Sequence, residues 1–325
     1  MIEVSHLSKH FKIAQPGEGF GGQLKALFAP TYKTIQAVNN ISYTIQPGEI
    51  VGYLGPNGAG KSTTIKLLTG VLTPSSGSVK VHGITPHRDR TANAYRIGVV
   101  YGQRSQLWWD LPLQDSFDIL AAMYRVQPVR YRQVLDELVE LLKMADFLTQ
   151  PVRRLSLGQR MKGDIVAALL HEPPVLYLDE PTIGLDVVAK NRILEFIRQL
   201  NLQKGTTVIL TTHNLSDVEQ ICQRIMIIDH GKVVLDDSQR EILNRFGRMR
   251  QLVVEFENGV RSVELTAGKV VKTEENKLTI EFDREQISAF DLILSLKDQQ
   301  GILDLSIKEE NIESIVTRIY EQGAR

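Results

Sequence analysis

The chain has 325 residues, of which 42% are hydrophobic, so it is long enough for one large globular domain and a small one. Lysine plus arginine and aspartate plus glutamate both number 38, and this balance gives no reason to expect nucleic acid as a partner. A single cysteine, Cys222, excludes an internal disulfide framework. We find neither a long apolar run nor a signal-peptide core, so we expect a soluble chain in a reducing compartment.

Apolar runs alternate with helical periodicity up to about residue 238, and this alternation predicts an α/β fold. The stretch from Pro112 to Leu170 interrupts the alternation, because its apolar residues repeat at helical spacing. We therefore expect a helical insert at about 104–170 within a domain spanning 1–238. The strands expected in that domain are Ile2–Val4, Ile41–Ile45, Ile50–Leu54, Val79–Val81, Ile97–Tyr101, Val175–Leu178, Val208–Thr211 and Ile225–Ile228.

The character of the sequence changes from about Gly247 onward. Runs typical of strands, at Leu252–Phe256, Ser262–Leu265 and Lys277–Phe282, are followed by a helix, a strand and a last helix with one apolar stripe. We expect residues 247–325 to form a separate small α+β domain, which carries none of the chemical motifs described below.

The sequence GPNGAGKS at residues 55–62 lies between the expected strand Ile50–Leu54 and a helical stretch. In a strand-loop-helix turn, several backbone N–H groups and the positive end of a helix dipole are directed at one point, where an anion can be held. Lys61 would reach the outer phosphates of a nucleoside triphosphate, and the Ser62 hydroxyl would ligate Mg²⁺. The loop therefore predicts a triphosphate-binding site.

The expected strand Val175–Leu178 runs directly into two carboxylates, Asp179 and Glu180. Beside a phosphate-binding loop, Asp179 can hold Mg²⁺ through water. Glu180 could polarise the attacking water as a general base.

Two further polar residues follow expected strands: Gln103 after Ile97–Tyr101 and His213 after Val208–Thr211. Strand ends in an open α/β sheet are where ligands bind, although a lone histidine or glutamine is also compatible with a structural role.

In their order and spacing, these motifs resemble those of the ATP-binding subunit of an ABC transporter. The resemblance covers residues 1 to about 238 and implies a P-loop NTPase core of the ABC ATPase type, with ATP and Mg²⁺ bound and ATP hydrolysed. It is carried by GPNGAGKST from residue 55, Gln103, LSLGQ at 155–159, VLYLDEP at 175–181, GLD at 184–186 and TTH ending at His213.

The resemblance assigns roles to individual residues. His213 would hold the γ-phosphate and the attacking water, acting in catalysis with Glu180 and Gln103, and Asp186 would communicate between two ATP sites. Ser62, Gln103 and Asp179 would hold Mg²⁺. The residues implied to contact ATP from the loop are Gly55, Asn57, Gly58, Gly60, Lys61, Ser62 and Thr63.

LSLGQ resembles the signature motif of the family, which serves the ATP bound by a second ATPase subunit. Ser156, Gly158 and Gln159 would open a helix whose dipole favours the γ-phosphate of that ATP. Leu157 stands where the family has glycine; it keeps the backbone N–H but adds bulk, which leaves the shape of the loop open. We expect two copies of this chain to form the pair.

Two aromatic residues are candidates for stacking on adenine, Phe11, which we favour, and Tyr32. The intervening segment 14–34 has apolar residues at helical spacing near lysines. It would either lie on a membrane surface or a partner, or close as a loop over its own domain.

Trp108 and Trp109 follow the glutamine loop, where the family couples ATP to its membrane partner; they are either core residues or an interaction hot spot. The single motif set, the small C-terminal domain and EPTIGLD resemble subunits of ABC-2 type exporters. This implies an ABC-2 type membrane permease as partner, a peripheral location on the cytoplasmic face of the cell membrane, and no nucleic-acid partner.

Two alternative functions fit the sequence less well. A soluble ABC-type ATPase acting on ribosomes or nucleic acid would resemble tandem ATPase pairs or carry long coiled coils, and neither is found. A GTPase would need an Asn/Thr-Lys-x-Asp run, which the chain lacks. The transported substrate is not indicated, because substrate contacts belong to the permease.

Overall fold

The computed structural model describes residues 1–14, 32–102, 104–257, 259, 265, 267–297, 299–309, 312, 314–316 and 318. The chain divides into two compact units, Met1–Asp236 and Asp237–Arg325. Most of the segment 14–34 lies outside the described residues, so the two interpretations of that segment stay open.

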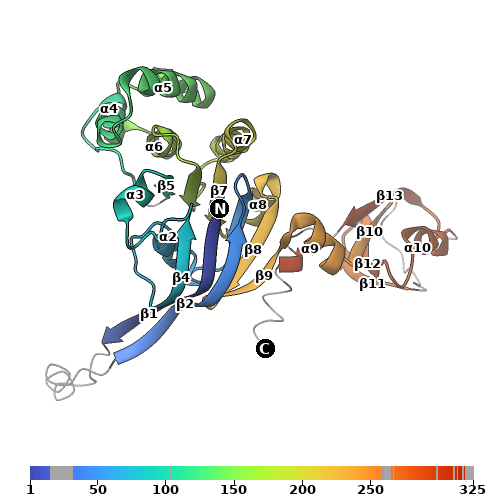
Figure 1. Ribbon diagram of the computed structural model, residues 1–325. Helices are drawn as coiled ribbons and strands as arrows, with labels where there is room; N and C mark the ends of the chain where they lie inside the picture. Colours follow the sequence, from blue (N-terminus) through green and yellow to red (C-terminus); the bar gives the residue numbers. More distant parts are fainter. Residues whose placement is uncertain are drawn as a thin grey trace, which may run out of the picture. The chain divides into compact units, whose positions relative to one another are not determined.

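The first unit contains a mostly parallel sheet and an antiparallel sheet with helices between the strands (Figure 1). Its helices are α2 (Lys61–Leu68), α3 (Arg90–Ala94), α4 (Leu113–Met123), α5 (Pro128–Leu142), α6 (Leu157–Leu169), α7 (Val187–Lys204) and α8 (Leu215–Ile221), with 3₁₀ turns at Ala145–Phe147 and Val152–Arg154. Its strands are β1 (Ile2–Ala14), β2 (Tyr32–Ile45), β3 (Ile50–Leu54), β4 (Ser76–Val81), β5 (Ile97–Tyr101), β6 (Val175–Asp179), β7 (Thr207–Thr212), β8 (Arg224–Asp229) and β9 (Lys232–Ser238), the last continuing into the second unit.

The central sheet has the order β5-β6-β7-β3-β8-β9. Strand β3 pairs in parallel with β7 and β8, and β6 pairs in parallel with β5 and β7. All residues of β3 and β7 are buried, which explains their continuous apolar runs, because a strand covered on both faces has no solvent side. Since these strands run in one direction, the loops that follow them meet at one edge of the sheet.

The antiparallel sheet has the order β2-β1-β4 and packs against the central sheet. Its inward residues, among them Ile2, Leu7 and Ile45, share one core with Tyr53 of β3 and Tyr177 of β6. All eight strands expected in this unit are observed, and β1 and β2 are several residues longer than predicted.

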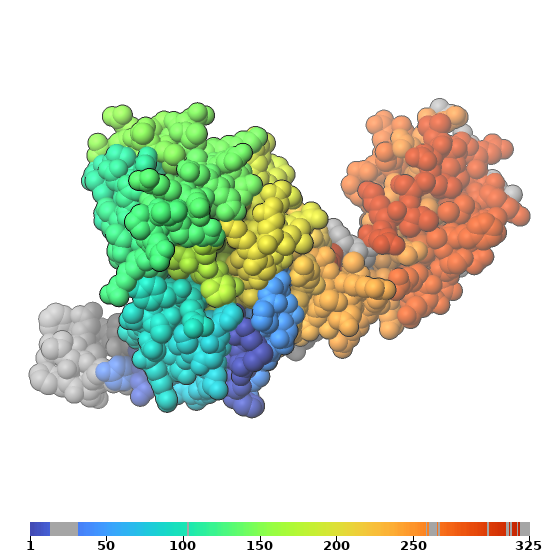
Figure 2. Space-filling model, turned by 45° about the horizontal axis from the view of Figure 1, so that its top comes forward, coloured from blue at the N-terminus to red at the C-terminus, as the bar shows by residue number. Residues whose placement is uncertain are grey.

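The predicted helical insert is present as α4, α5 and α6, which Figure 1 shows grouped next to α3 and β5. Helix α5 begins at Pro128, whose fixed φ suits the first turn of a helix, and buries Val134, Leu135, Leu138 and Leu142 on one face. In the space-filling view this segment, coloured green, forms the upper part of the first unit (Figure 2).

The second unit contains helix α9 (Gln239–Phe246) and an antiparallel sheet of order β11-β12-β10-β13. The sheet is formed by β10 (Met249–Phe256), β11 (Lys269–Thr273), β12 (Lys277–Asp283) and β13 (Ile302–Glu309), with α10 (Ala289–Ser295) packed on it. The unit has its own core, which includes Leu252, Ile280, Phe282 and Leu292.

Most of the strand expected at Ser262–Leu265 lies outside the described part of the chain, and Leu265, which is described, belongs to no regular element. Among the described residues, the strand before β12 is β11, at Lys269–Thr273, and all of its residues are exposed. An exposed strand shows no burial pattern, so periodicity could not indicate it.

Among the described residues, none of the helices combines the length and the apolar character that crossing a lipid bilayer requires.

Candidate active site

The loop from Gly55 to Gly60 connects β3 to α2 and is held close to neighbouring backbone. A Cβ at Gly60, where φ is +109°, would lie 2.2 Å from the carbonyl oxygen of Ala37 in β2. A Cβ at Gly55 would lie 2.5 Å from the carbonyl oxygen of Ile228. Only glycine fits at these two positions, which explains why the loop begins and ends with it.

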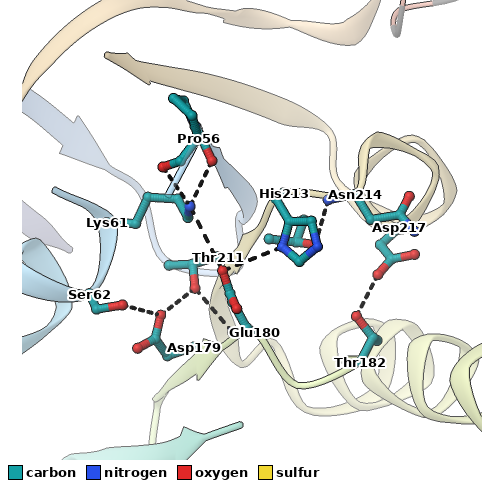
Figure 3. A network of polar contacts seen from close by, with 12 residues as sticks. Pro56, Lys61, Ser62, Asp179, Glu180, Thr182, Thr211, His213, Asn214 and Asp217 are labelled. Carbon is teal, nitrogen blue, oxygen red and sulfur yellow. Dashed lines mark hydrogen bonds and ion pairs between the residues drawn. The ribbon is translucent and has the colours of Figure 1, made fainter. Parts of the chain in front are cut away.

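Lys61 is the first residue of α2, and only 5% of it is exposed. Its Nζ donates to the carbonyl oxygens of Gly55 (2.6 Å) and Pro56 (3.2 Å), and lies 3.8 Å from Oε1 of Glu180 (Figure 3). Burial lowers the pKa of Lys61, while the charges of Glu180 and Asp179 oppose that shift. A buried cation at the start of a helix is placed to meet phosphate oxygens.

Ser62 and Asp179 bring a hydroxyl and a carboxylate together. The Ser62 hydroxyl donates to Oδ1 of Asp179 at 3.1 Å, and the Thr211 hydroxyl donates to the same oxygen at 2.5 Å. Mg²⁺ prefers hard oxygen ligands and commonly uses only one or two protein groups beside substrate phosphates. The pair therefore fits a magnesium ion that completes its coordination with phosphate and water.

Glu180 lies between Lys61 and His213. Its Oε1 is 3.5 Å from Nδ1 of His213, and its side chain is 17% exposed against 52% for that of His213 (Figure 3). The backbone of Glu180 has a φ of +55°, in the left-handed region, and its N–H donates to the hydroxyl (3.1 Å) and the carbonyl oxygen (3.0 Å) of Thr211. These hydrogen bonds hold the backbone of Glu180 at the strand end, and the carboxylate extends from that fixed position.

Ser62, Asp179, Glu180 and His213 line one cleft of about 510 Å³. Gln103 lies outside the described residues, and its neighbours Gly102 and Arg104 both line this cleft. The described residues that form its wall are Asn57, Ser62, Lys66, Val71, Tyr101, Gly102, Arg104, Asp179, Glu180, Ile183 and His213.

Ser156 caps the N-terminus of α6. Its Oγ accepts from the N–H of Gln159 (3.2 Å), and Oε1 of Gln159 accepts from the N–H of Ser156 (2.9 Å). Because the hydroxyl acts as acceptor in this cap, its own hydrogen stays available to donate. Ser156 is exposed and is not part of the described wall of the cleft.

Leu157 is 39% exposed and packs beside the GLD sequence. A Cβ at Gly184 would lie 3.0 Å from Cδ2 of Leu157, and one at Gly158 would lie 3.3 Å from Cβ of Ala189. Asp186 caps α7, since its Oδ1 accepts from the N–H of Ala189 at 2.9 Å. The start of α6 and the start of α7 therefore lie against each other.

The two candidates for adenine stacking lie in the β1–β2 hairpin. Phe11 pairs with Ile35 of β2, and Nζ of Lys9 lies 5.3 Å from the centre of its ring. Tyr32, at the beginning of β2, is 59% exposed. Neither is part of the described wall of the cleft, and the choice between them stays a prediction.

Trp108 and Trp109 are 37% and 51% exposed, so the interpretation of both as core residues is wrong. The guanidinium of Arg160, on α6, lies 4.8 Å from the centre of the Trp109 ring. The segment that follows Gln103 thus presents aromatic surface at the signature helix.

Sequence reasoning missed two residues that organise the site. Thr211 forms hydrogen bonds with both Asp179 and Glu180. Its position as the first residue of TTH, in a buried strand, was the available signal. Asp164 of α6 accepts from the Ser105 hydroxyl (2.9 Å) and the N–H of Gln106 (3.0 Å), which ties the glutamine loop to the signature helix. No local motif marks a contact between residues so far apart in the chain.

Comparisons with known proteins identify the family of the chain. Residues 38–183 match the family model described as ABC transporter. The linearmycin resistance ATP-binding protein LnrL of Bacillus subtilis (strain 168) is 32% identical over 301 residues, covering 90% of this chain and 96% of the relative. The daunorubicin resistance ATP-binding protein DrrA3 of Streptomyces coeruleorubidus is 34% identical over 258 residues, 79% of each chain.

The fold is also that of solved ATP-binding cassettes. A dimeric post-hydrolysis structure of the cassette MJ0796 bound to ADP and Pi superimposes with a TM-score of 0.60 at 26% identity, covering 73% of this chain and 98% of that one. Residues of the phosphate loop and two strand-end carboxylates line one cleft. The fold is shared with such cassettes, and the sequence aligns with that of LnrL over most of its length. These findings lead to one conclusion. The chain belongs to the ABC transporter family as an ATP-binding subunit, and it is an ATPase.

Proposed function

We propose that this chain drives export through a separate ABC-2 type membrane permease, binding Mg-ATP between two copies of itself at the cytoplasmic face of the membrane. The names of the relatives support export, because LnrL and DrrA3 are both described as resistance ATP-binding proteins. The observation that best supports the proposed hydrolysis mechanism is the position of the Glu180 carboxylate. Its Oε1 lies 3.8 Å from Nζ of Lys61 and 3.5 Å from Nδ1 of His213 at the cleft.

The motif residues at and beside the cleft have proposed roles in hydrolysis. Lys61 would donate to the outer phosphates, and the backbone N–H groups of the loop would hold the remaining oxygens. Ser62 and Asp179 would hold Mg²⁺, which neutralises phosphate charge as the reaction proceeds. Gln103 would complete this site.

Glu180 would accept a proton from the attacking water. At the same time the water oxygen would bond to the γ-phosphorus, and the bond from that phosphorus to the β–γ bridging oxygen would break. His213 would donate to the γ-phosphate and hold the water on the side of Glu180. Thr211 keeps the Glu180 backbone in place during this step.

Ser156, Gly158 and Gln159 are proposed to complete the ATP site of the second copy. Ser156 is exposed, its hydroxyl hydrogen is available to donate, and the first N–H groups of α6 have no acceptor within the helix. Asp186, at the start of α7 next to Leu157, would link one site to the other.

The permease is proposed to dock beside the glutamine loop. Trp108 and Trp109 expose aromatic surface there, a residue type enriched at the centres of interfaces. Copurification of the full chain with a hydrophobic membrane protein, lost on Trp109→Ala, tests this assignment. Copurification with ribosomes or nucleic acid in place of a membrane protein would contradict it.

The general-base role predicts a specific phenotype for Glu180→Gln. The amide keeps the size and hydrogen bonding of the side chain but cannot take a proton, so we expect turnover to fall by about 10²–10⁴-fold with ATP still bound. Glu195→Gln, at an exposed position on α7, is the matched control and should turn over normally. Hydrolysis by Glu180→Gln at the wild-type rate would disprove the role.

A further inference from the structure

Asp217 is a fully buried carboxylate that the proposed mechanism does not use. It lies on α8, and its side chain is 0% exposed. Its Oδ2 accepts from the Thr182 hydroxyl at 2.5 Å, and its Oδ1 lies 2.7 Å from Nζ of Lys190. Both oxygens therefore contact side chains from outside α8.

The two partners come from the segments that carry the site. Thr182 stands two residues after Glu180 and is itself buried, and Lys190 stands in α7, whose N-cap is Asp186. Figure 3 shows Thr182 reaching Asp217 from the Glu180 loop. One carboxylate thus joins the Glu180 loop and the start of α7 to α8.

Helix α8 begins at Leu215, two residues after His213. Asn214 is the N-cap, and its Oδ1 accepts from the N–H (3.0 Å) and the hydroxyl (2.8 Å) of Ser216. Nζ of Lys190 also donates to the Ser216 hydroxyl at 3.2 Å. A shift of α8 relative to the Glu180 loop would therefore move His213 relative to Glu180.

The Glu180 backbone needs support on both sides, because its φ of +55° is one that residues other than glycine rarely adopt. Thr211 supplies it on the N-terminal side through the Glu180 N–H, and Thr182 supplies it on the C-terminal side through Asp217. A buried charge is retained at low cost only where partners satisfy it, as Thr182 and Lys190 do here.

We propose that Asp217 is a positioning residue that sets the distance and angle between Glu180 and His213 through its contacts with Thr182 and Lys190. This inference rests on the proposed roles of Glu180 and His213 in hydrolysis. Asp217 itself touches neither ATP nor the attacking water.

The test removes the hydroxyl that connects the Glu180 loop to Asp217. Thr182→Val is nearly isosteric, and we expect kcat of the full chain to fall about tenfold or more with KM for ATP changed less than about twofold, because small displacements of reacting groups are costly. Thr182→Ser keeps the hydroxyl and should retain kcat within about threefold.

Thr207→Val is the matched control. Thr207 is also buried and its hydroxyl accepts from the N–H of Gly48 at 3.0 Å, but it lies at the opposite end of β7 from the site. We expect this variant to lower the Tm while kcat stays at the wild-type value. The double variant Thr182→Val/Asp217→Asn removes the contact without leaving a buried charge lacking its donor, and it should show the same loss of kcat if the single variant folds poorly.

Three outcomes decide the matter. A loss of kcat in Thr182→Val that Thr182→Ser restores, with no loss in Thr207→Val, supports the positioning role. Equal kcat in Thr182→Val and wild type, with Glu180→Gln inactive, overturns this inference and leaves the proposed function standing. Turnover by Glu180→Gln at the wild-type rate overturns both.

Discussion

Lys61 is a buried cation between two loop carbonyls and the carboxylate of Glu180. Lys61→Ala removes a point charge that we propose meets the outer phosphates, so ATP affinity should fall by about tenfold or more, the range expected for a hydrogen bond to a charged group. Lys80→Ala, at an exposed position on β4, is the control and should bind ATP as the wild type does. Equilibrium titration with ATP measures the effect, and unchanged affinity in Lys61→Ala would remove the lysine from the phosphate site.

Asp164 links the glutamine loop to helix α6. The side chain of Asp164 is buried, and this burial affects its protonation. Burial raises the pKa of Asp164 from 3.8 to about 6, against the hydrogen bonds from Gln106 and Ser105, which lower it. The folded state therefore holds this proton more tightly than the unfolded chain does. Its contribution to stability is present below a pH of about 4 and is lost as the pH rises to about 6.

Asp164→Asn cannot titrate, so the Tm of the variant minus that of the wild type should increase between pH 4 and pH 6 and then stay constant. The full difference corresponds to on the order of 3 kcal/mol. Thermal unfolding of both proteins across this range measures it, with Asp146→Asn, at an exposed position, as control. A difference that is flat over the range would contradict the assignment.

The elements that the sequence predicted best are short strands that are mostly apolar and buried. The bounds of β3 and β5 were predicted to the residue, because each is a short apolar run that ends at the phosphate loop or at a glycine. Strands β9 and β11 were missed because much of β9 is only partly buried and β11 is wholly exposed. Periodicity carries no information about such strands.

The residues of the site also differ in whether the sequence could predict them. Residues within the local motifs, such as Lys61 and Glu180, could be found from spacing, and the structure places Nζ of Lys61 3.8 Å from Oε1 of Glu180. The contact between Thr182 and Asp217 joins residues 35 apart, and that between Ser105 and Asp164 joins residues 59 apart. Only the folded chain shows such pairs, because each partner is an ordinary polar residue in its own segment.

At the scale of the whole molecule, the two units have separate cores. Among the described residues, the core around Tyr53 and Tyr177 lies within Met1–Asp236, and that around Leu252 and Phe282 lies within Asp237–Arg325. We therefore predict that a chain ending at Ser238 folds and binds ATP with wild-type affinity, which titration and thermal unfolding would measure. A folded truncated chain that fails to bind ATP would show that the second unit contributes to the site.

The central claim is that each ATP is held by Lys61 of one copy and Ser156 of the other. Lys61→Ala homodimers and Ser156→Arg homodimers each have two broken sites. A mixed dimer has one site with both defects and one site with an intact phosphate loop and an intact signature. A site built within one chain could not be restored in this way.

The decisive measurement is ATP occlusion in verified mixed dimers, with Glu180→Gln in both chains so that bound ATP is not hydrolysed. We predict about one occluded ATP per mixed dimer and essentially none in either parent. No occlusion in the mixed dimer would contradict the claim, and would mean that LSLGQ, with Leu157 in place of glycine, does not act across the interface.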